Sequence, residues 1–379
     1  MLKKIDKKLL RLIGMFLGVI ILLLLIALLI GLMGKQRLSY VGIEEKMISS
    51  AKNYYKDNNI YLPQIVGNST EVSLETLVND GYMKDPSTYM NNKKLSCVGR
   101  VTVTKNKDDY SYYSYLNCGK DYETTYLANE IKNKVVTSSD GIYKIDEYTV
   151  SSNGQKNVAV NYVYRGEHVN NNLLINNKKW RIVKIDGNDN IVIIYNDKDP
   201  NQELYGVWDD RYNSDKDAAY GINDYTVSRA KENLEKIYNS GFFGKDIKTK
   251  FLSHSVCIGK RSEKDSTNNG SIECSKVLDN QYLSLLPVYD YINASIDSKC
   301  KKITDPECLN YNYLSLYSSS WWFATASKEK SYLVYKSSSD KVSTSSAYNS
   351  GRYRMVALLD GKTIVSGGNG SETNPYVLR

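Results

Sequence analysis

The feature that most constrains this chain is an uncharged run from Leu12 to Met33 near its start. As a helix, a run of this length would rise by about 33 Å at about 1.5 Å a residue, close to the thickness of a bilayer core. Five basic side chains and one acidic side chain precede the run, and a basic flank is typical of a cytoplasmic end. The run therefore predicts cytoplasmic residues 1–11, a transmembrane helix over residues 12–34, and a single-pass cell membrane protein whose remaining chain is extracellular.

A cleaved signal peptide is the alternative to this anchor, but its apolar region would be about 7–15 residues long and would end at a small-x-small site. Neither property is present, so we predict an uncleaved signal-anchor. The chain has 50 basic and 42 acidic residues, of which seven basic residues and one acidic residue precede Leu38. The rest of the chain is therefore nearly balanced, with 43 basic and 41 acidic residues. Nucleic-acid binding is not expected, because it needs a clustered basic excess.

All six cysteines follow the apolar run, in a part of the chain expected to face an oxidising compartment. Their even number favours disulfides, although six cysteines allow many pairings. Cys97 and Cys118 are the best pair, because a hairpin turn at residues 107–108 would place them opposite each other. A zinc site is not expected, since the chain has no CxxC or HxxxH spacing. The simplest remaining pairs are Cys257 with Cys274 and Cys300 with Cys308.

Periodicity predicts the first extracellular domain, over residues 35–136. Apolar side chains at helical spacing predict that the membrane helix continues unbroken to about Asn58. A second, short helix is expected near residues 73–79. Alternating residues then predict two strands, over residues 97–105 and 110–118. The domain is therefore expected to be a helix packed on a small sheet.

A second domain is predicted over residues 142–379, after a short linker rich in Ser, Asp and Gly. The roughly 340 residues beyond the apolar run exceed what one hydrophobic core usually holds. Alternating apolar residues and turn signals predict several strands, and helical periodicity predicts two helices. The strands are expected at residues 158–164, 173–176, 180–185 and 191–195, and the helices at residues 228–239 and 288–294.

The apolar N-terminal helix, its amphipathic continuation, the small sheet and the nearby cysteine pair together resemble the type IV pilin and pseudopilin family. The resemblance covers residues 12 to about 125. The prepilin processing motif Gly-Phe-Thr-Leu-x-Glu is absent, because residues 14–19 contain no Glu and lie inside the apolar run. The resemblance implies pilin-like partners that contact one another through their transmembrane helices.

The order of elements in the second domain, the adjacent Trp321 and Trp322, and the Gly- and Asn-rich residues 367–378 resemble another family. This is the C-type-lectin-like fold, in the loop-rich form of formylglycine-generating-enzyme relatives and bacterial surface proteins. The predicted fold class is therefore α+β, with a single transmembrane helix that continues into a pilin-like helix-on-sheet domain. A loop-rich C-type-lectin-like α+β domain follows.

Catalytic chemistry has little support in the sequence. The two histidines, His168 and His254, stand in no metal-binding or triad pattern, and nucleotide-binding loops are absent. Formylglycine-generating relatives use redox-active cysteines, which directs attention to Cys300 and Cys308, but a structural disulfide is the favoured interpretation. A glycan or cell-wall hydrolase would need two carboxylates at a fixed separation, and nothing singles out such a pair. We expect no catalytic residues.

One acidic segment has the spacing of a cation site. Asp197, Asp199 and Asn201 alternate as oxygen ligands of Ca²⁺ can do. The segment does not match the EF-hand pattern, since Gln202 stands where Gly is needed. A calcium site and a solvated acidic loop are both compatible with this pattern, and no other cofactor is expected.

Binding is predicted to use loops of the second domain, where large aromatic side chains have polar neighbours. Of Trp321 and Trp322, one is expected in the core and the other partly exposed, because successive strand residues point to opposite faces. The predicted function is a membrane-anchored extracellular binding or adhesion protein with a surface glycan or protein ligand. The alternative is a minor pseudopilin-like structural component of a secretion or pilus machine. The predicted ligand-binding residues are Tyr205, Trp208, Asp209, Asp210, Trp322 and Tyr348.

Overall fold

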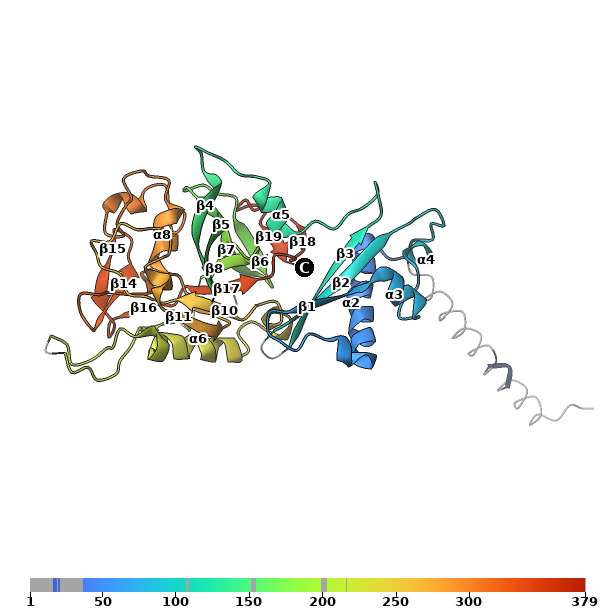
Figure 1. Ribbon diagram of the computed structural model, residues 1–379, viewed down its shortest axis with the longest axis horizontal. Helices are drawn as coiled ribbons and strands as arrows, with labels where there is room; N and C mark the ends of the chain where they lie inside the picture. Colours follow the sequence, from blue (N-terminus) through green and yellow to red (C-terminus); the bar gives the residue numbers. More distant parts are fainter. Residues whose placement is uncertain are drawn as a thin grey trace, which may run out of the picture. The chain divides into compact units, whose positions relative to one another are not determined.

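The computed structural model describes most of the chain, namely residues 16–18, 20, 37–106, 109–150, 155–198, 203–215 and 217–378. These residues form two compact units (Figure 1). The first unit consists of the described residues up to Leu62, Glu71–Thr102 and Ser114–Thr124. The second consists of Pro63–Thr70, Val103–Tyr113 and Thr125 onward.

The first unit is built around helix α2 (Tyr40–Asp57). The helix begins after Ser39, whose backbone is extended and whose Oγ accepts a hydrogen bond from the Gly42 N–H at 3.1 Å. An Oγ in this position satisfies a backbone donor that the first turn leaves unpaired. The buried apolar side chains of α2 recur every four residues and form one stripe along the helix. They are Ile43, Met47, Ala51 and Tyr55.

A three-stranded sheet in the order β1-β2-β3 packs on this helix. Gly99 on β2 lies so close to α2 that a Cβ there would be 2.9 Å from Cε of Met47. The strands are β1 (Ser69–Ser73), β2 (Val98–Lys105) and β3 (Tyr110–Asn117). The short helices beside them are η1 (Asn59–Tyr61), α3 (Leu74–Asn79) and α4 (Pro86–Met90).

The largest sheet of the second unit has nine strands in the order β12-β17-β8-β7-β6-β19-β18, with β5 joining β4 to β7. Its β6–β7 turn contains Asn176 and Asn177 at φ +47° and +61°, the left-handed pair that a tight two-residue hairpin requires. The strands are β4 (Gly141–Val150), β5 (Lys156–Arg165), β6 (Asn172–Ile175), β7 (Lys178–Ile185), β8 (Ile191–Tyr195), β12 (Ser284–Leu285), β17 (Met355–Leu359), β18 (Val365–Gly367) and β19 (Tyr376–Leu378).

A five-stranded sheet in the order β15-β14-β13-β16-β9 completes the second unit, together with the two-stranded pair β10-β11. The five strands are β9 (Tyr205–Val207), β13 (Trp321–Ala326), β14 (Leu333–Ser337), β15 (Val342–Ser346) and β16 (Ser350–Arg352), and the pair is β10 (His254–Cys257) and β11 (Val277–Gln281). The helices are α5 (Leu127–Lys132), η2 (Tyr225–Val227), α6 (Arg229–Asn239), α7 (Lys245–Lys248), η3 (Glu273–Ser275), α8 (Val288–Ala294) and η4 (Pro306–Leu309).

The core of the second unit is one continuous apolar cluster that runs from Leu127 to Tyr376 along the chain. Trp180 on β7 shows how it is packed, since its ring makes an edge contact with Tyr195 at 5.2 Å and with Phe251 at 5.6 Å between centroids. Edge-to-face contacts of this kind are the favoured geometry of aromatic pairs. Neighbouring strands and the segment after α7 therefore share one buried aromatic group.

All six cysteines form disulfides, and all three predicted pairs are confirmed. Cys97 and Cys118 flank the facing strands β2 and β3, although the turn predicted at residues 107–108 lies outside the described residues. Three disulfides in a chain of this size are typical of an extracellular protein. The pairs are Cys97–Cys118, Cys257–Cys274 and Cys300–Cys308.

The predicted fold class is wrong in its helical part. More of the described residues lie in strands than in helices, and the described helices are short. Residues 37–39 are not helical, so the expected unbroken continuation into α2 is replaced by a new helix that starts at a serine cap. The pilin-like arrangement of one long helix is therefore not supported. Apart from residues 16–18 and 20, the predicted transmembrane segment lies outside the described residues.

The predicted localisation, a single-pass protein of the cell membrane, is also corrected. Within the described ranges, each helix is too short or too polar to cross a bilayer. The longest helix, α2, has 18 residues, but it alternates its buried apolar stripe with Lys and Glu side chains. It is an amphipathic helix of a folded unit and not a membrane span.

Candidate functional site

Strands β9 and β16 bring together the residues that the sequence predicted for binding. In this antiparallel pair, Tyr205 lies opposite Arg352. The Trp322 Nε1–H donates to the Gly206 carbonyl at 3.2 Å, and the Asp209 N–H donates to the Ala347 carbonyl at 2.9 Å. Segments more than 100 residues apart in the sequence therefore meet at this edge of the five-stranded sheet.

The two predicted tryptophans form the floor of this region and are not exposed. Trp208 is fully buried, and its Nε1–H donates to the Phe323 carbonyl at 3.0 Å. Trp322 is fully buried as well, beneath Lys336, whose Nζ lies 4.9 Å from the ring centroid. The expectation that Trp321 or Trp322 is partly exposed is wrong, because β13 lies inside the sheet and both of its faces are covered.

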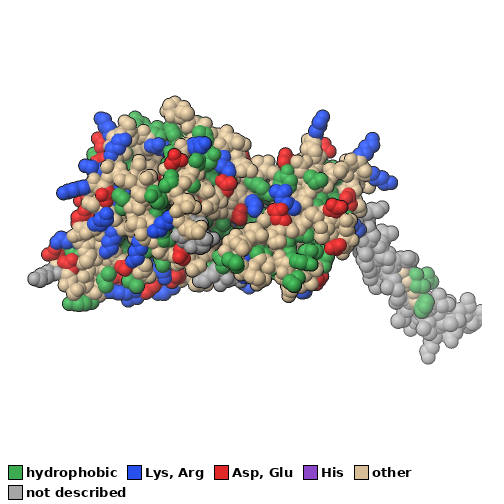
Figure 2. Space-filling view, viewed as in Figure 1, with side chains coloured by type: hydrophobic (Ala, Val, Ile, Leu, Met, Phe, Trp, Pro, Cys, Tyr) green, Lys and Arg blue, Asp and Glu red, His purple; other side chains and the backbone are tan. Residues whose placement is uncertain are grey.

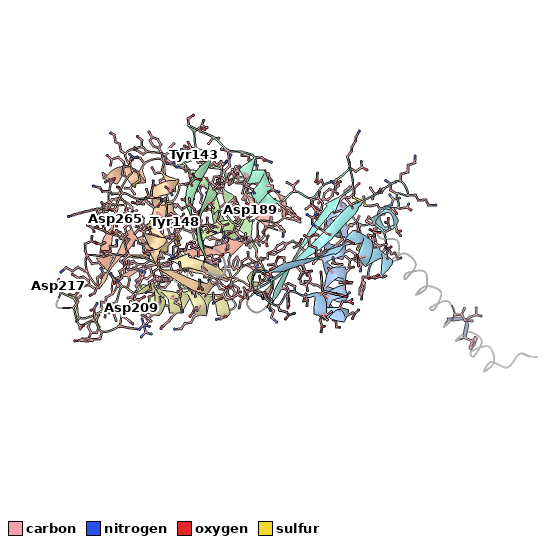
Figure 3. The ribbon with its side chains drawn as sticks, in the orientation of Figure 1. Tyr143, Tyr148, Asp189, Asp209, Asp217 and Asp265 are labelled. Atoms are coloured by element: carbon pink, nitrogen blue, oxygen red, sulfur yellow. A yellow bond between two sulfur atoms is a disulfide. The ribbon has the colours of Figure 1, made fainter. Side chains whose placement is uncertain are left out.

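Asp209 holds the chain in place, because its carboxylate accepts bonds from three separate backbone positions. Its Oδ1 accepts from the N–H groups of Arg211 and Ile222, both at 3.0 Å, and its Oδ2 accepts from the N–H of Arg229 at 3.3 Å. The Arg211 guanidinium also pairs with Asp209. Figure 3 labels Asp209 and Asp217 in the same part of the second unit. A buried carboxylate with these partners orders the loop and leaves little capacity for a ligand.

Asp210 belongs to a charged group at the surface beside α6. The Arg229 guanidinium bonds to Asp210 Oδ1 at 2.7 Å and to Glu232 Oε2 at 2.8 Å, and Arg211 reaches Glu232 at 2.6 Å. The hydrogen bonds that Arg229 donates to Asp210 and Glu232 raise the pKa of Arg229, and the bond from Arg229 lowers the pKa of Glu232. Arg229 and Glu232 are therefore both charged at neutral pH.

Exposed tyrosines lie next to this charged group. The rings of Tyr220 and Tyr348 are stacked, with 5.4 Å between centroids and 29° between planes. Tyr212 is bridged to Tyr220 in an antiparallel β-bridge, so these three tyrosines form one group, here named the tyrosine platform. Their exposures are 73%, 51% and 52% for Tyr212, Tyr220 and Tyr348. Tyr205, predicted for binding, is 46% exposed on β9.

Gly221 lets the platform form. Its φ is +91°, and a Cβ there would lie 3.0 Å from the Tyr348 backbone nitrogen and 3.1 Å from Ala347 Cβ. The Gly221 N–H donates to the Arg211 carbonyl at 2.7 Å, and its carbonyl accepts from Asn213 Nδ2 at 2.6 Å. A residue with a side chain would be strained in this backbone conformation, so glycine fixes Tyr220 beside Tyr348.

The predicted calcium segment contributes no described cluster of ligands. Asp197 Oδ2 accepts from the Lys179 N–H at 3.2 Å and its Oδ1 from the Lys198 N–H at 2.8 Å. Asp199 and Asn201 lie outside the described residues. Among the residues that are described, three or more His, Cys, Asp or Glu side chains nowhere gather as metal ligands would.

His254 and Ser284 form the nearest approach to a catalytic pair in the described structure. His254 Nε2 lies 3.4 Å from Ser284 Oγ, and its Nδ1 lies 3.3 Å from the Leu252 carbonyl. Burial lowers the pKa of His254 to about 4, so its ring is neutral at pH 7. Ser284 is only 2% exposed, and a nucleophile needs access to its substrate. The described geometry therefore gives Ser284 no access to a substrate, although the half-buried His254 lines a pocket.

Comparisons with family models, with curated proteins and with solved structures found no match, so the pilin-like and C-type-lectin-like resemblances rest on the sequence alone. The structure adds Tyr212 and Tyr220 to the residues that the sequence singled out. Their sequence signal was weak, because the chain has 33 tyrosines and nothing in the local pattern marks these two.

Proposed function

We propose that this is an extracellular binding protein whose tyrosine platform binds a glycan. The observation that supports the proposal is the gathering of three exposed tyrosines, of which Tyr220 and Tyr348 have stacked rings and Tyr212 is bridged to Tyr220 through the backbone. Trp208, Trp322 and Asp209 are buried in the same region. Side chains that are already ordered lose little entropy on binding, so such a surface is prepared for a ligand.

A glycan fits the chemistry of the platform better than an apolar protein surface does. A tyrosine ring offers a flat apolar face with a hydroxyl at its edge, and a sugar ring has a flat C–H face with hydroxyls at its edge. Donors and acceptors border the platform in the Arg229–Asp210 and Lys330–Asp217 ion pairs. Figure 2 shows charged side chains of both signs on this face of the second unit, and charged residues are depleted at the centre of protein interfaces.

The test is binding of the full chain to arrays of glycans and cell-wall polysaccharides, followed by titration of the best ligand. Replacing both Tyr220 and Tyr348 with Ala should weaken binding at least about tenfold, because central aromatic contacts usually carry more than about 1.4 kcal/mol. The control is Tyr61→Ala, which removes a tyrosine of similar exposure from the first unit. Unchanged affinity in the double variant, or binding to proteins but to no glycan, would contradict the proposal.

A further inference from the structure

A second polar region of this unit is a pocket with a volume of about 470 Å³, whose described lining contains none of the three platform tyrosines. Three cationic side chains line it, Arg181, Lys198 and Arg352, and the one lining carboxylate is Asp197. Ser318 and Ser319 add hydroxyl groups. Among the described lining side chains, cations therefore outnumber carboxylates by three to one.

Arg181 on β7 presents its guanidinium to this pocket with neutral partners. Its Nε–H donates to Asn171 Oδ1 at 2.7 Å, and Nη2 lies 3.4 Å from the Val169 carbonyl. The group also lies 4.8 Å from the centroid of the Tyr313 ring. In the part of the chain that is described, no carboxylate comes within 4 Å of it, and Glu372 acts on it only at longer range. Burial lowers its pKa.

Arg354 lies directly beneath the pocket and is 1% exposed. Its guanidinium donates to the carbonyls of Tyr195 and Leu314, both at 3.1 Å, and to Asn196 Oδ1 at 2.6 Å. It stacks on Tyr317, a lining residue, at 4.4 Å. Burial lowers the pKa of Arg354 to about 10, and the charge of Arg181 acts in the same direction. A half-buried cation, Arg181, and a fully buried one, Arg354, are therefore close together with neutral hydrogen-bond acceptors.

The other deeply buried cations of the second unit are paired differently. Lys184 bonds to Glu147 at 3.0 Å and to Asp290 at 2.6 Å, and Arg261 bonds to Glu273 at 2.8 Å. A buried charge without an opposite charge is unfavourable. Lys184 and Arg261 therefore have carboxylate partners, whereas Arg181 and Arg354 share with the half-buried Arg165, which donates to the Ser295 carbonyl, a set of neutral acceptors. Of these three, Arg181 and Arg354 are the two that lie at one pocket.

Tyr313 gives a second, independent indication of a ligand. Its side chain is 1% exposed and lines the pocket, yet within the described structure its hydroxyl has no hydrogen-bond partner. Buried hydroxyl groups in proteins nearly always have one. The hydroxyl lies in the field of both Arg181 and Arg354, and also of Asp290 and Lys184. Its oxygen has almost no accessible surface, so it donates a hydrogen bond to an anion only if the Tyr313 ring turns toward the pocket.

We propose that this pocket binds the phosphate group of a phosphorylated ligand, held by the Arg181 guanidinium and the Tyr313 hydroxyl. A phosphate monoester carries a charge of about −1.5 to −2 near neutral pH, which matches the surplus of cations better than one carboxylate does. Guanidinium groups bind phosphate oxygens through paired N–H donors. Arg354 contributes its charge from below, and Lys198 and Arg352 stand at the edge.

The experiment is calorimetric titration of the full chain with inorganic phosphate, glucose 6-phosphate and glucuronate, with glucose as the neutral probe. Both phosphates should bind, and glucuronate should bind at least tenfold more weakly. Tighter binding of glucuronate would overturn the assignment to phosphate. Failure of every anion to bind up to about 10 mM, a limit that corresponds to a very weak interaction, would overturn the site itself.

Two variants keep the test independent of folding. Arg181→Gln should abolish phosphate binding, whereas Arg100→Gln, a surface arginine of the first unit, should leave it unchanged. Tyr313→Phe removes only the unpartnered hydroxyl, so it should weaken phosphate binding several-fold without lowering the melting temperature. If Tyr313→Phe bound phosphate as wild type does, the hydroxyl would have no role and the proposal would fail. Neither variant touches the tyrosine platform, so the outcome is separate from glycan binding.

Discussion

Single residues decide how this protein tolerates buried charge. Lys184 is buried between Glu147 and Asp290, with the Tyr289 hydroxyl at 3.2 Å from its Nζ. Asn293 Nδ2 bonds to the other oxygen of Glu147. The attraction of Asp290 and Glu147 outweighs desolvation, so the pKa of Lys184 is raised, whereas burial raises the pKa of Asp290 to about 7. The cluster joins β4, β7 and α8.

Removing the cation from this cluster should be costly. We expect Lys184→Met to destabilise the second unit by about 3–5 kcal/mol, because it leaves two carboxylates buried without a counter-ion. Urea unfolding followed by fluorescence would measure the loss. Lys299→Met, at an exposed lysine, is the control and should stay within about 0.5 kcal/mol of wild type. A loss as small as the control's would show that water or protonation already satisfies the two acids.

His254 should make stability depend on pH in a defined window. Its folded pKa of about 4 lies below its ordinary value of 6.5, so the unfolded chain binds a proton that the folded chain does not. Stability from this group is therefore present above pH 6.5 and is lost as the pH falls from 6.5 towards 4. The full shift corresponds to about 3–4 kcal/mol. The raised pKa of Asp290 acts in the opposite direction over the same range, because its folded form holds the proton longer.

Comparing the pH dependence of stability in wild type and in a variant at this position isolates the contribution of His254. We expect His254→Asn to unfold in urea with a smaller loss of stability between pH 6.5 and pH 4.5 than wild type. Identical pH profiles for the two proteins would mean that the imidazole is protonated in the folded state. Such a result would contradict the burial of the ring.

At the scale of elements, Gly221 offers a sharp test of the platform. Gly221→Ala places a Cβ against the Tyr348 backbone in a left-handed conformation, which should cost at least about 1–2 kcal/mol. It should also separate Tyr220 from Tyr348 and weaken glycan binding. Gly241→Ala is the matched control, because no atom lies within 4 Å of its Cβ position. Melting curves and glycan titrations of the two variants check both effects, and equal affinity in both would argue against the platform.

The elements also show what a sequence of this kind reveals. Strands β5 to β8 and helices α6 and α8 were predicted near their observed bounds, because alternation, helical spacing and Asn-Asn turns are local signals. Strands β9 and β16 have three residues each, too few to display a period. Their pairing depends on contacts between distant segments, so the site could be assigned to loops of the second domain but not assembled.

The same limit explains the misplaced tryptophan and the missed cations. Trp322 was expected to be partly exposed, because successive residues of a strand point to opposite faces of the sheet. This alternation does not reveal whether both faces of the sheet are covered by other elements. Arg181 lies on β7, and Arg354 is the residue directly before β17. Only tertiary packing brings these two side chains close together. Among 50 basic residues, nothing local marks these two.

At the scale of the whole molecule, the disulfides divide between the two units and should be separable in their effects. Cys97 and Cys118 both belong to the first unit, although the loop that they close includes Val103–Tyr113 of the second, and the other two pairs lie in the second unit. A loop with a separation of 21 residues contributes about 3 kcal/mol through the entropy of the unfolded chain. Replacing both cysteines with Ser should therefore lower the calorimetric transition of the first unit. Because the platform and the cationic pocket belong to the second unit, glycan and phosphate affinities should not change in this variant.

The control is the double replacement of Cys257 and Cys274, which should lower the calorimetric transition of the second unit and weaken ligand binding. A single transition that shifts equally in both variants would show that the two units unfold as one, and the assignment of binding to the second unit alone would then need a different test.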